Sequence, residues 1–134
     1  MLGHSAPFAH IHAINLTQNK SLILKRIGYL MCSLFFNKDS DLLIMLVSTI
    51  LKDLNSTDVH EVVICLTALG NIMNNTIASG IIDAVVKLTN HSTDLVRKKS
   101  ILILQKIVNI LLSLENLNRC RSHRLQRKVK KSPV

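Results

Sequence analysis

Cys120 and His123 are the residues of this chain whose types and spacing come nearest to a metal site. A cysteine and a histidine three residues apart can both bind zinc, but a structural zinc site needs four ligands and no second pair follows. The remaining histidines are scattered along the chain at His4, His10, His12, His60 and His91. We therefore expect the protein to hold no metal ion and no cofactor.

The sequence also lacks the patterns on which enzymatic chemistry depends. It contains no glycine-rich phosphate loop and no nucleophile elbow, and its eight acidic residues form no paired-carboxylate site. Aromatic residues make up 3% of the chain, which leaves little material for an aromatic ligand cage. We predict that the protein is not an enzyme and has no catalytic residues.

Positive charge is the property of this chain best suited to binding. The net charge is +9, but seven of the 17 Lys and Arg residues lie in the last sixteen positions, with no acid among them, and the rest of the chain is nearly neutral. Such an asymmetry points to an acidic partner. The candidate contacts to an acidic protein or a phosphate headgroup are Lys25, Arg26, Arg97, Lys98, Lys99, Arg124, Arg127, Lys128, Lys130 and Lys131.

Each basic cluster also has a plainer interpretation. Lys25 and Arg26 fit the solvated face of a helix. Residues 97–99 fall in the first turns of a predicted helix, where basic charge opposes the helix dipole, so an acidic neighbouring repeat or a headgroup would explain them. The basic tail fits an anionic membrane surface, a nuclear import signal, or nucleic acid bound without stacking, since it has no aromatic residue. It also fits a disordered segment of no function.

A segment that nearly repeats itself sets the expected fold. Ser56-Thr57-Asp58-Val59 returns as Ser92-Thr93-Asp94-Leu95, and the apolar positions that follow each string return at an offset of 35. A period in this range is typical of stacked helical hairpins, in which no single hairpin can bury its own apolar face. The sequence therefore predicts an all-α, HEAT- or armadillo-like solenoid fragment.

Apolar residues spaced by three and four predict about six helices. We expect them to pair in order, 22–36 with 41–54 and 58–73 with 77–88, and the last helix to lack a partner. Residues 1–114 would form the helical repeats, and residues 115–134 a basic, disordered tail. The predicted helices span residues 8–16, 22–36, 41–54, 58–73, 77–88 and 94–114.

The three cysteines form no paired framework. Cys32 and Cys65 lie in apolar helical runs, where we expect them to act as small buried hydrophobic residues. The N-terminus shows no charged segment followed by an apolar core, so we expect no signal peptide and a reducing, cytosolic setting.

Two resemblances sharpen this prediction. Residues 93–107, with an Asp, a Val-Arg pair and spaced Leu and Ile, resemble the first helix of a HEAT-type repeat. A more specific set of strings, over residues 1 to about 110, resembles the N-terminal trunk of the large adaptin subunits of clathrin-type adaptor complexes. Among these subunits the resemblance is strongest to the epsilon subunit of the fourth adaptor complex. These strings are Met1-Leu2-Gly3-His4, Phe8-Ala9-His10-Ile11-His12-Ala13, Lys25-Arg26-Ile27-Gly28-Tyr29-Leu30 and Lys52-Asp53-Leu54.

The resemblance implies a structural subunit, or a fragment of one, in vesicle-mediated intracellular protein transport. It implies beta, medium and small adaptor subunits as partners, contact with an Arf-type small GTPase, and a cytoplasmic location at the trans-Golgi network or endosomal membrane in a coated vesicle. Gly28 and Tyr29 are then candidates for close helix packing. The alternatives are a nucleic-acid or anionic-membrane binding protein that acts through the tail, and a truncated product without stable function.

Overall fold

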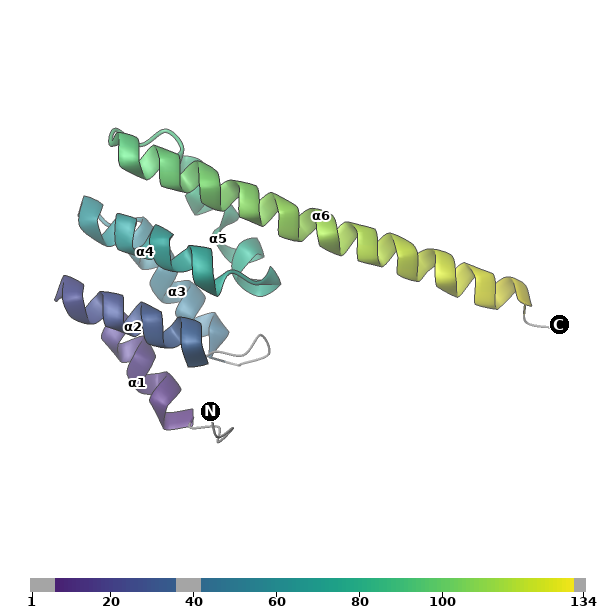
Figure 1. Cartoon of the computed structure of the whole chain (residues 1–134), viewed down its shortest axis with the longest axis horizontal. Coiled ribbons are helices and arrows are strands. Elements are labelled where there is room, and N and C mark those ends of the chain that lie inside the picture. Colours follow the sequence, from purple (N-terminus) through teal and green to yellow (C-terminus); the bar gives the residue numbers. More distant parts are fainter. Residues whose placement is uncertain (1–6, 36–41, 132–134) are drawn as a thin grey trace.

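Residues 7–35 and 42–131, which the computed structural model describes, form six α-helices and no strand (Figure 1). All six predicted helices are present, and five of them begin and end within two residues of the expected positions. The helices are α1 (Pro7–Thr17), α2 (Leu22–Phe35), α3 (Leu43–Leu54), α4 (Val59–Ile72), α5 (Asn75–Leu88) and α6 (Asp94–Lys131).

Short polar side chains begin two of the helices. Asn74 accepts a hydrogen bond from the backbone N–H of Ile77 at 2.9 Å, and Asp58 accepts one from His60 at 2.9 Å, so each caps the helix that follows. Asp58 and Glu61 have the spacing of a capping box, but Glu61 does not complete one. Its carboxylate instead accepts a hydrogen bond from the Ser56 hydroxyl at 2.5 Å.

The helices form two layers, with α2, α4 and α6 in one and α1, α3 and α5 in the other (Figure 1). Consecutive helices pack closely along their backbones as the hairpins α1–α2, α3–α4 and α5–α6, whereas the backbones of α2 and α3, and of α4 and α5, do not approach closely among the described residues. The expected pairing was therefore wrong by one helix. The first short helix begins the first hairpin, so α6 is the second helix of its hairpin and has α5 as its partner.

The sequence repeat is a structural period. The two Ser-Thr-Asp strings stand at the starts of α4 and α6, which occupy equivalent places in successive hairpins and lie side by side. The core runs through all three hairpins, because each covers the apolar face of the next, as in a solenoid. Its fully buried aliphatic side chains include Ile14, Leu46, Ile50, Leu66, Leu69, Ile77, Ile81, Val96 and Ile107.

Helix α6 is far longer than predicted. We expected it to end near residue 114 and a disordered tail to follow, but it continues unbroken through 38 residues to Lys131. Residues 115–131 contain no Gly or Pro and are rich in Arg and Lys, which favour helix, so nothing in the sequence stops it. By length and composition alone α6 resembles a membrane-spanning helix, but its first half packs on α4 and α5.

Gly28 marks the closest approach of two helices. A Cβ atom built at Gly28 would lie 2.5 Å from the backbone nitrogen of Thr17 and 2.8 Å from the carbonyl carbon of Leu16, so only glycine lets α2 pack this tightly on α1. This confirms the expected packing role of Gly28. Gly70 is different, because a Cβ there would meet nothing nearer than the Lys106 ammonium at 3.6 Å.

These two glycines provide a matched pair for mutation. Gly28→Ala should lower the free energy of unfolding by about 1–3 kcal/mol, because the added methyl group forces two helix backbones apart. Gly70→Ala should raise it by about 0.5–1 kcal/mol, because alanine loses less backbone entropy in a helix. Urea unfolding followed by circular dichroism measures both changes. Equal effects of the two substitutions would contradict the close approach of α1 and α2.

The cysteines should differ sharply in reactivity. Burial raises the pKa of the Cys32 and Cys65 thiols to about 12, and both residues are fully buried, whereas Cys120 is exposed on α6. Since the thiolate is the reactive form, a disulfide reagent at pH 8 should modify one thiol rapidly in the native protein and three in urea. Cys120→Ser should abolish the rapid reaction, and rapid modification of a second thiol would count against the described core.

Candidate protein-interaction surface

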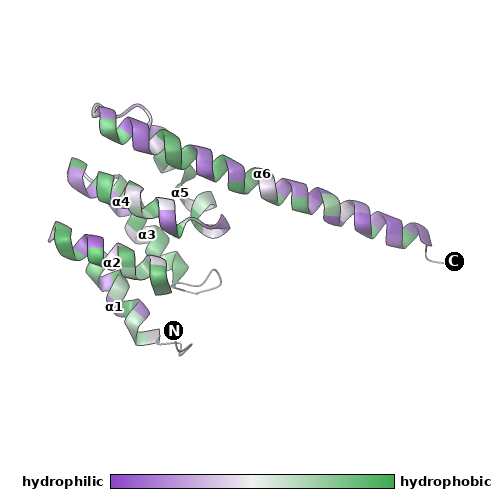
Figure 2. Ribbon diagram, in the orientation of Figure 1, coloured by the Kyte–Doolittle hydropathy of each residue, from purple (hydrophilic) through white to green (hydrophobic). Residues whose placement is uncertain are grey.

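Helix α2 turns its aliphatic side chains away from the core. Four of them are spaced by four, three and four residues, the spacing of a seam that packs on another helix. They are substantially exposed, with accessible fractions of 72%, 42%, 58% and 60%. This exposed row, here called the α2 stripe, consists of Ile23, Ile27, Leu30 and Leu34. Figure 2 shows the hydrophobic character of α2 in the layer that it forms with α4 and α6.

A groove runs between the α2 stripe and α4. Its volume is about 630 Å³, and most of its surface is apolar. Helix α4 supplies Val63, Ile64 and Ala68 to the opposite wall, and Arg26 stands on the α2 side. An exposed apolar row beside an apolar groove has the form in which an amphipathic helix of a partner is bound. The surface is suited to protein recognition.

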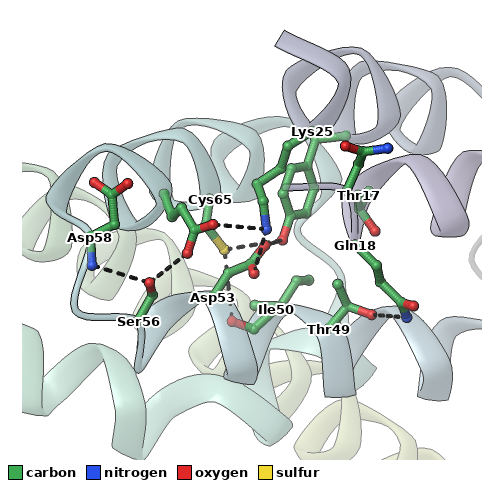
Figure 3. A network of polar contacts seen from close by, with 12 residues as sticks. Thr17, Gln18, Lys25, Thr49, Ile50, Asp53, Ser56, Asp58 and Cys65 are labelled. Atoms are coloured by element: carbon green, nitrogen blue, oxygen red, sulfur yellow. Dashed lines mark hydrogen bonds and ion pairs between the residues drawn. The ribbon is translucent and has the colours of Figure 1, made fainter. Parts of the chain in front are cut away.

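The inward face of α2 explains this orientation. Gly28, Tyr29 and Cys32 are buried there, and Lys25 is buried with them at 3% exposure. We expected Lys25 to lie on a solvated face or to contact an external acidic group, and both expectations were wrong for this residue. Its ammonium group lies 2.7 Å from the carboxylate of Asp53 on α3, itself 3% exposed (Figure 3).

A small polar cluster completes this buried pair. The Tyr29 hydroxyl donates a hydrogen bond of 2.5 Å to the second oxygen of Asp53, and the Cys65 sulfur lies 3.6 Å from the same hydroxyl. Burial, with the nearby Cys65 and Asp53, raises the pKa of the Tyr29 phenol, which keeps it protonated as a donor. Glu61 of α4 adds a carboxylate 3.7 Å from Lys25. The cluster joins α2, α3 and α4.

Among the described residues, no buried polar side-chain atom of this cluster or elsewhere lacks a hydrogen-bond partner. A buried polar network with every group satisfied rigidifies the packing around it, whereas a catalytic centre presents reactive groups to a substrate. Four members of the cluster, Lys25, Tyr29, Asp53 and Cys65, are buried, and Glu61 at its edge is partly exposed. We interpret it as the joint between the first two hairpins.

The other candidate cations that precede residue 115 are exposed or half-buried. Arg26 is exposed on α2, as expected of a solvated face. Arg97 donates hydrogen bonds to the carbonyl oxygens of His91 and Ser92, and both Arg97 and Lys98 pair with Asp94. Lys98 and Arg97 thereby lower the pKa of the Asp94 carboxyl. Asp94 thus offsets the basic charge at the start of α6, and the hydrogen bonds of Arg97 tie the α5–α6 turn to this helix. Lys99 is half-buried.

The other predicted contacts lie on the second half of α6. All five are exposed, and they lie on a different helix from Lys25 and Arg26: Arg124, Arg127, Lys128, Lys130 and Lys131. Cys120 and His123 are exposed on the same stretch, and no group of three potential metal ligands gathers within residues 7–35 and 42–131. The structure therefore does not bring the predicted basic residues together into one site.

Sequence reasoning missed the two features that define this surface. Nothing in the spacing of α2 marks its aliphatic row as exposed, because a 3–4 spacing is also what a buried face shows. A second row on α2 has the same helical spacing and was available as a signal: Lys25, Gly28, Tyr29 and Cys32. It contains the one glycine and the one tyrosine of the helix. Asp53, the one acidic residue of the largely apolar helix α3, is the ion partner that fits Lys25.

Stacked helical hairpins define a helical-repeat protein, in which each repeat packs on its neighbours. The adaptin N-terminal region family matches residues 1–132, so the chain belongs to this family. The match continues past residue 110, where we expected the resemblance to end.

Several subunits of adaptor complexes are similar to this chain. The AP-4 complex subunit epsilon of Arabidopsis thaliana is 42% identical over 106 residues, which cover 79% of this chain and 11% of that protein. The AP-4 complex subunit epsilon-1 of Homo sapiens is 41% identical, over 79% of this chain and 9% of that protein. The AP-3 complex subunit delta-1 of Bos taurus is 29% identical, over 80% of this chain and 9% of that protein. The chain thus spans about a tenth of the length of these relatives.

The buried pair gives a clear mutational prediction. Lys25→Met should lower the free energy of unfolding by about 3–5 kcal/mol, because it leaves the Asp53 carboxylate buried without its ion partner. Lys25→Met combined with Asp53→Leu should cost less than Lys25→Met alone, because no uncompensated charge remains. Lys98→Met, which breaks an exposed pair, should cost less than about 1 kcal/mol. Urea unfolding measures all three, and a loss for Lys25→Met as small as that for Lys98→Met would refute the buried joint.

Proposed function

We propose that this chain acts as a piece of the large-subunit trunk of an adaptor complex in vesicle-mediated protein transport, and that it works by binding other proteins. Its family membership and its similarity to AP-4 and AP-3 subunits support the proposal. The observation that carries the mode of action is the exposed α2 stripe beside the groove on α4. No catalytic step is part of this function.

The partners proposed for the groove are sibling subunits of the complex: beta, medium or small. A helix of such a subunit that covers the α2 stripe removes aliphatic side chains from water, and each contributes about 1.5–3 kcal/mol when fully buried. The groove walls from α4 would hold the same helix from the other side. Arg26, exposed at the groove, would orient an acidic residue of the partner.

The location that accompanies this role is the cytoplasmic surface of trans-Golgi or endosomal membranes, in a coated vesicle. Two further contacts belong to the proposal, one with an Arf-type small GTPase and one with the membrane surface. In the trunk of a coat, these contacts act together with subunit assembly.

Co-expression with tagged small and beta adaptor subunits tests the proposal. The full chain should co-purify with at least one of them, and the double substitution Ile27→Asp/Leu30→Asp should reduce its recovery by about tenfold or more, because two apolar contacts are lost. Ile44→Asp provides the matched control, since Ile44 is 74% exposed on α3 and does not line the groove. It should leave recovery unchanged.

Circular dichroism must show the same helix content in all three proteins for this comparison. Failure to recover the unaltered chain with either subunit would count against the proposed role. Equal recovery of the Ile27→Asp/Leu30→Asp protein and the unaltered protein would exclude the groove as the contact surface.

A further inference from the structure

The second half of α6 extends past the helices on which the first half packs. Val96, Ser100, Ile103 and Ile107 form the buried row of α6 and face α4 and α5, whereas every residue from 115 to 131 is exposed. We call residues 115–131 the overhang. Figure 1 shows it projecting beyond the ends of α4 and α5 as the yellow-green end of the helix.

The overhang continues the core-facing side of α6. The buried row advances by three or four residues, and the same steps lead through Leu114, Asn118 and Arg121 to Leu125 and Val129. Leu125 is 58% exposed and Val129 74% exposed, and Leu117, at the edge of this row, is 67% exposed. The row that is covered over its first half is therefore bare over its second half, where it carries both aliphatic and polar side chains.

A hollow marks the place where cover ends. It has a volume of about 270 Å³ and lies between the first residue of α5, Asn75, and the α6 side chains Ile110, Leu114 and Leu117. A helix lying along the overhang would have one end at this hollow, next to the start of α5. The bare row is thus bounded by the body of the protein at its start and open to solvent at its far end.

Cations share this face of α6 and continue along one edge of it. Arg121 and Lys128 lie between Leu117 and Leu125 around the helix, and Arg124 and Lys131 lie at the edge. Glu115 is the single acid of the overhang against seven Lys and Arg, and none of the ion pairs found in the described chain involves these cations. The charge of this surface is uncompensated.

We propose that the overhang binds an acidic amphipathic helix of another protein. The docking face consists of Leu117, Leu125 and Val129 with the adjacent Arg121, Arg124 and Lys128. The apolar side chains would pack on the apolar stripe of the partner, and the cations would pair with carboxylates along one edge of that stripe. Because the aliphatic and basic side chains share one face of α6, a helix lying along it meets both over several turns, as in helix-in-groove recognition.

Other occupants fit this face less well. A second copy of the chain would bring seven like charges against seven, which opposes association. A bilayer is a plane, and the bare row points to the same side of α6 as α4 and α5, so the body of the protein stands in the way. Nucleic acid would use the cations but not the aliphatic row, and α6 offers no aromatic side chain for stacking.

Binding of synthetic helical peptides to the full chain tests the proposal by fluorescence anisotropy. One peptide carries Leu at alternating three- and four-residue steps with Glu along one edge, and its control carries Gln in place of Glu. The chain should bind the Glu peptide at least about tenfold more tightly than the Gln peptide, because several charge pairs are lost. Raising the salt concentration should reduce this difference.

Two variants separate the docking face from general charge attraction. Leu125→Ser/Val129→Ser keeps every charge and should weaken binding of the Glu peptide about tenfold or more, because the apolar contact is lost. Leu112→Ser is the matched control, because Leu112 is 51% exposed but lies on the opposite side of α6, and it should leave binding unchanged. Both positions are exposed, so the fold does not depend on them.

Three outcomes would overturn the proposal. They are equal binding of the Glu and Gln peptides, binding of the Glu peptide that ignores Leu125→Ser/Val129→Ser, and absence of peptide binding together with tight binding of a single-stranded RNA oligonucleotide or of phosphatidylserine vesicles. None of these results bears on the α2 stripe, which lies on another helix. The overhang can therefore fail this test while the proposed adaptor function stands.

Discussion

The Asp53 carboxylate is the group on which the arrangement of the first two hairpins depends. A charge taken out of water costs several kcal/mol unless ion pairing and hydrogen bonds compensate it, and the partners of Asp53 are Lys25 and Tyr29, both on α2. Helix α2 must therefore turn these polar side chains inward. Because a helix has only one inward face, its aliphatic row is left outside. The apolar stripe proposed to bind a partner is thus a consequence of a polar interaction in the core.

This dependence explains what the sequence predicts and what it does not. Apolar spacing identifies all six helices, and the Ser-Thr-Asp repeat identifies equivalent helices, because both are local in the chain. The same spacing cannot say which row of α2 is buried, since Ile23 and Ile27 have the periodicity of a core face. That choice is made by Asp53, which lies 24 residues from Tyr29 and acts across three helices. Likewise, the basic character of residues 119–131 predicted a tail, but their helix propensity decides their structure.

The helix at which the repeat begins decides which helices pair into hairpins, and the length of the repeat does not. The offset of 35 is the same whether hairpins are counted from α1 or from α2, so the period alone does not choose between the two arrangements. The close approach at Gly28 does choose, because it brings α2 onto α1 at a distance that only a helix without a side chain at this position allows. Counted this way, α5 covers the first half of α6, and the overhang is left without cover in the described structure.

Cations that look alike in the sequence have three different environments in the fold. Lys25 is desolvated and paired in the core, Arg97 donates hydrogen bonds to the carbonyl groups of a turn, and the overhang cations face water without an ion pair in the described chain. A surface ion pair contributes little to folding, so stability does not require seven cations on a projecting helix. Uncompensated charge of this density next to a bare apolar row instead favours association, because charge guides the encounter and apolar contact retains the partner. The position of each cation, and not the net charge of the chain, therefore favours binding.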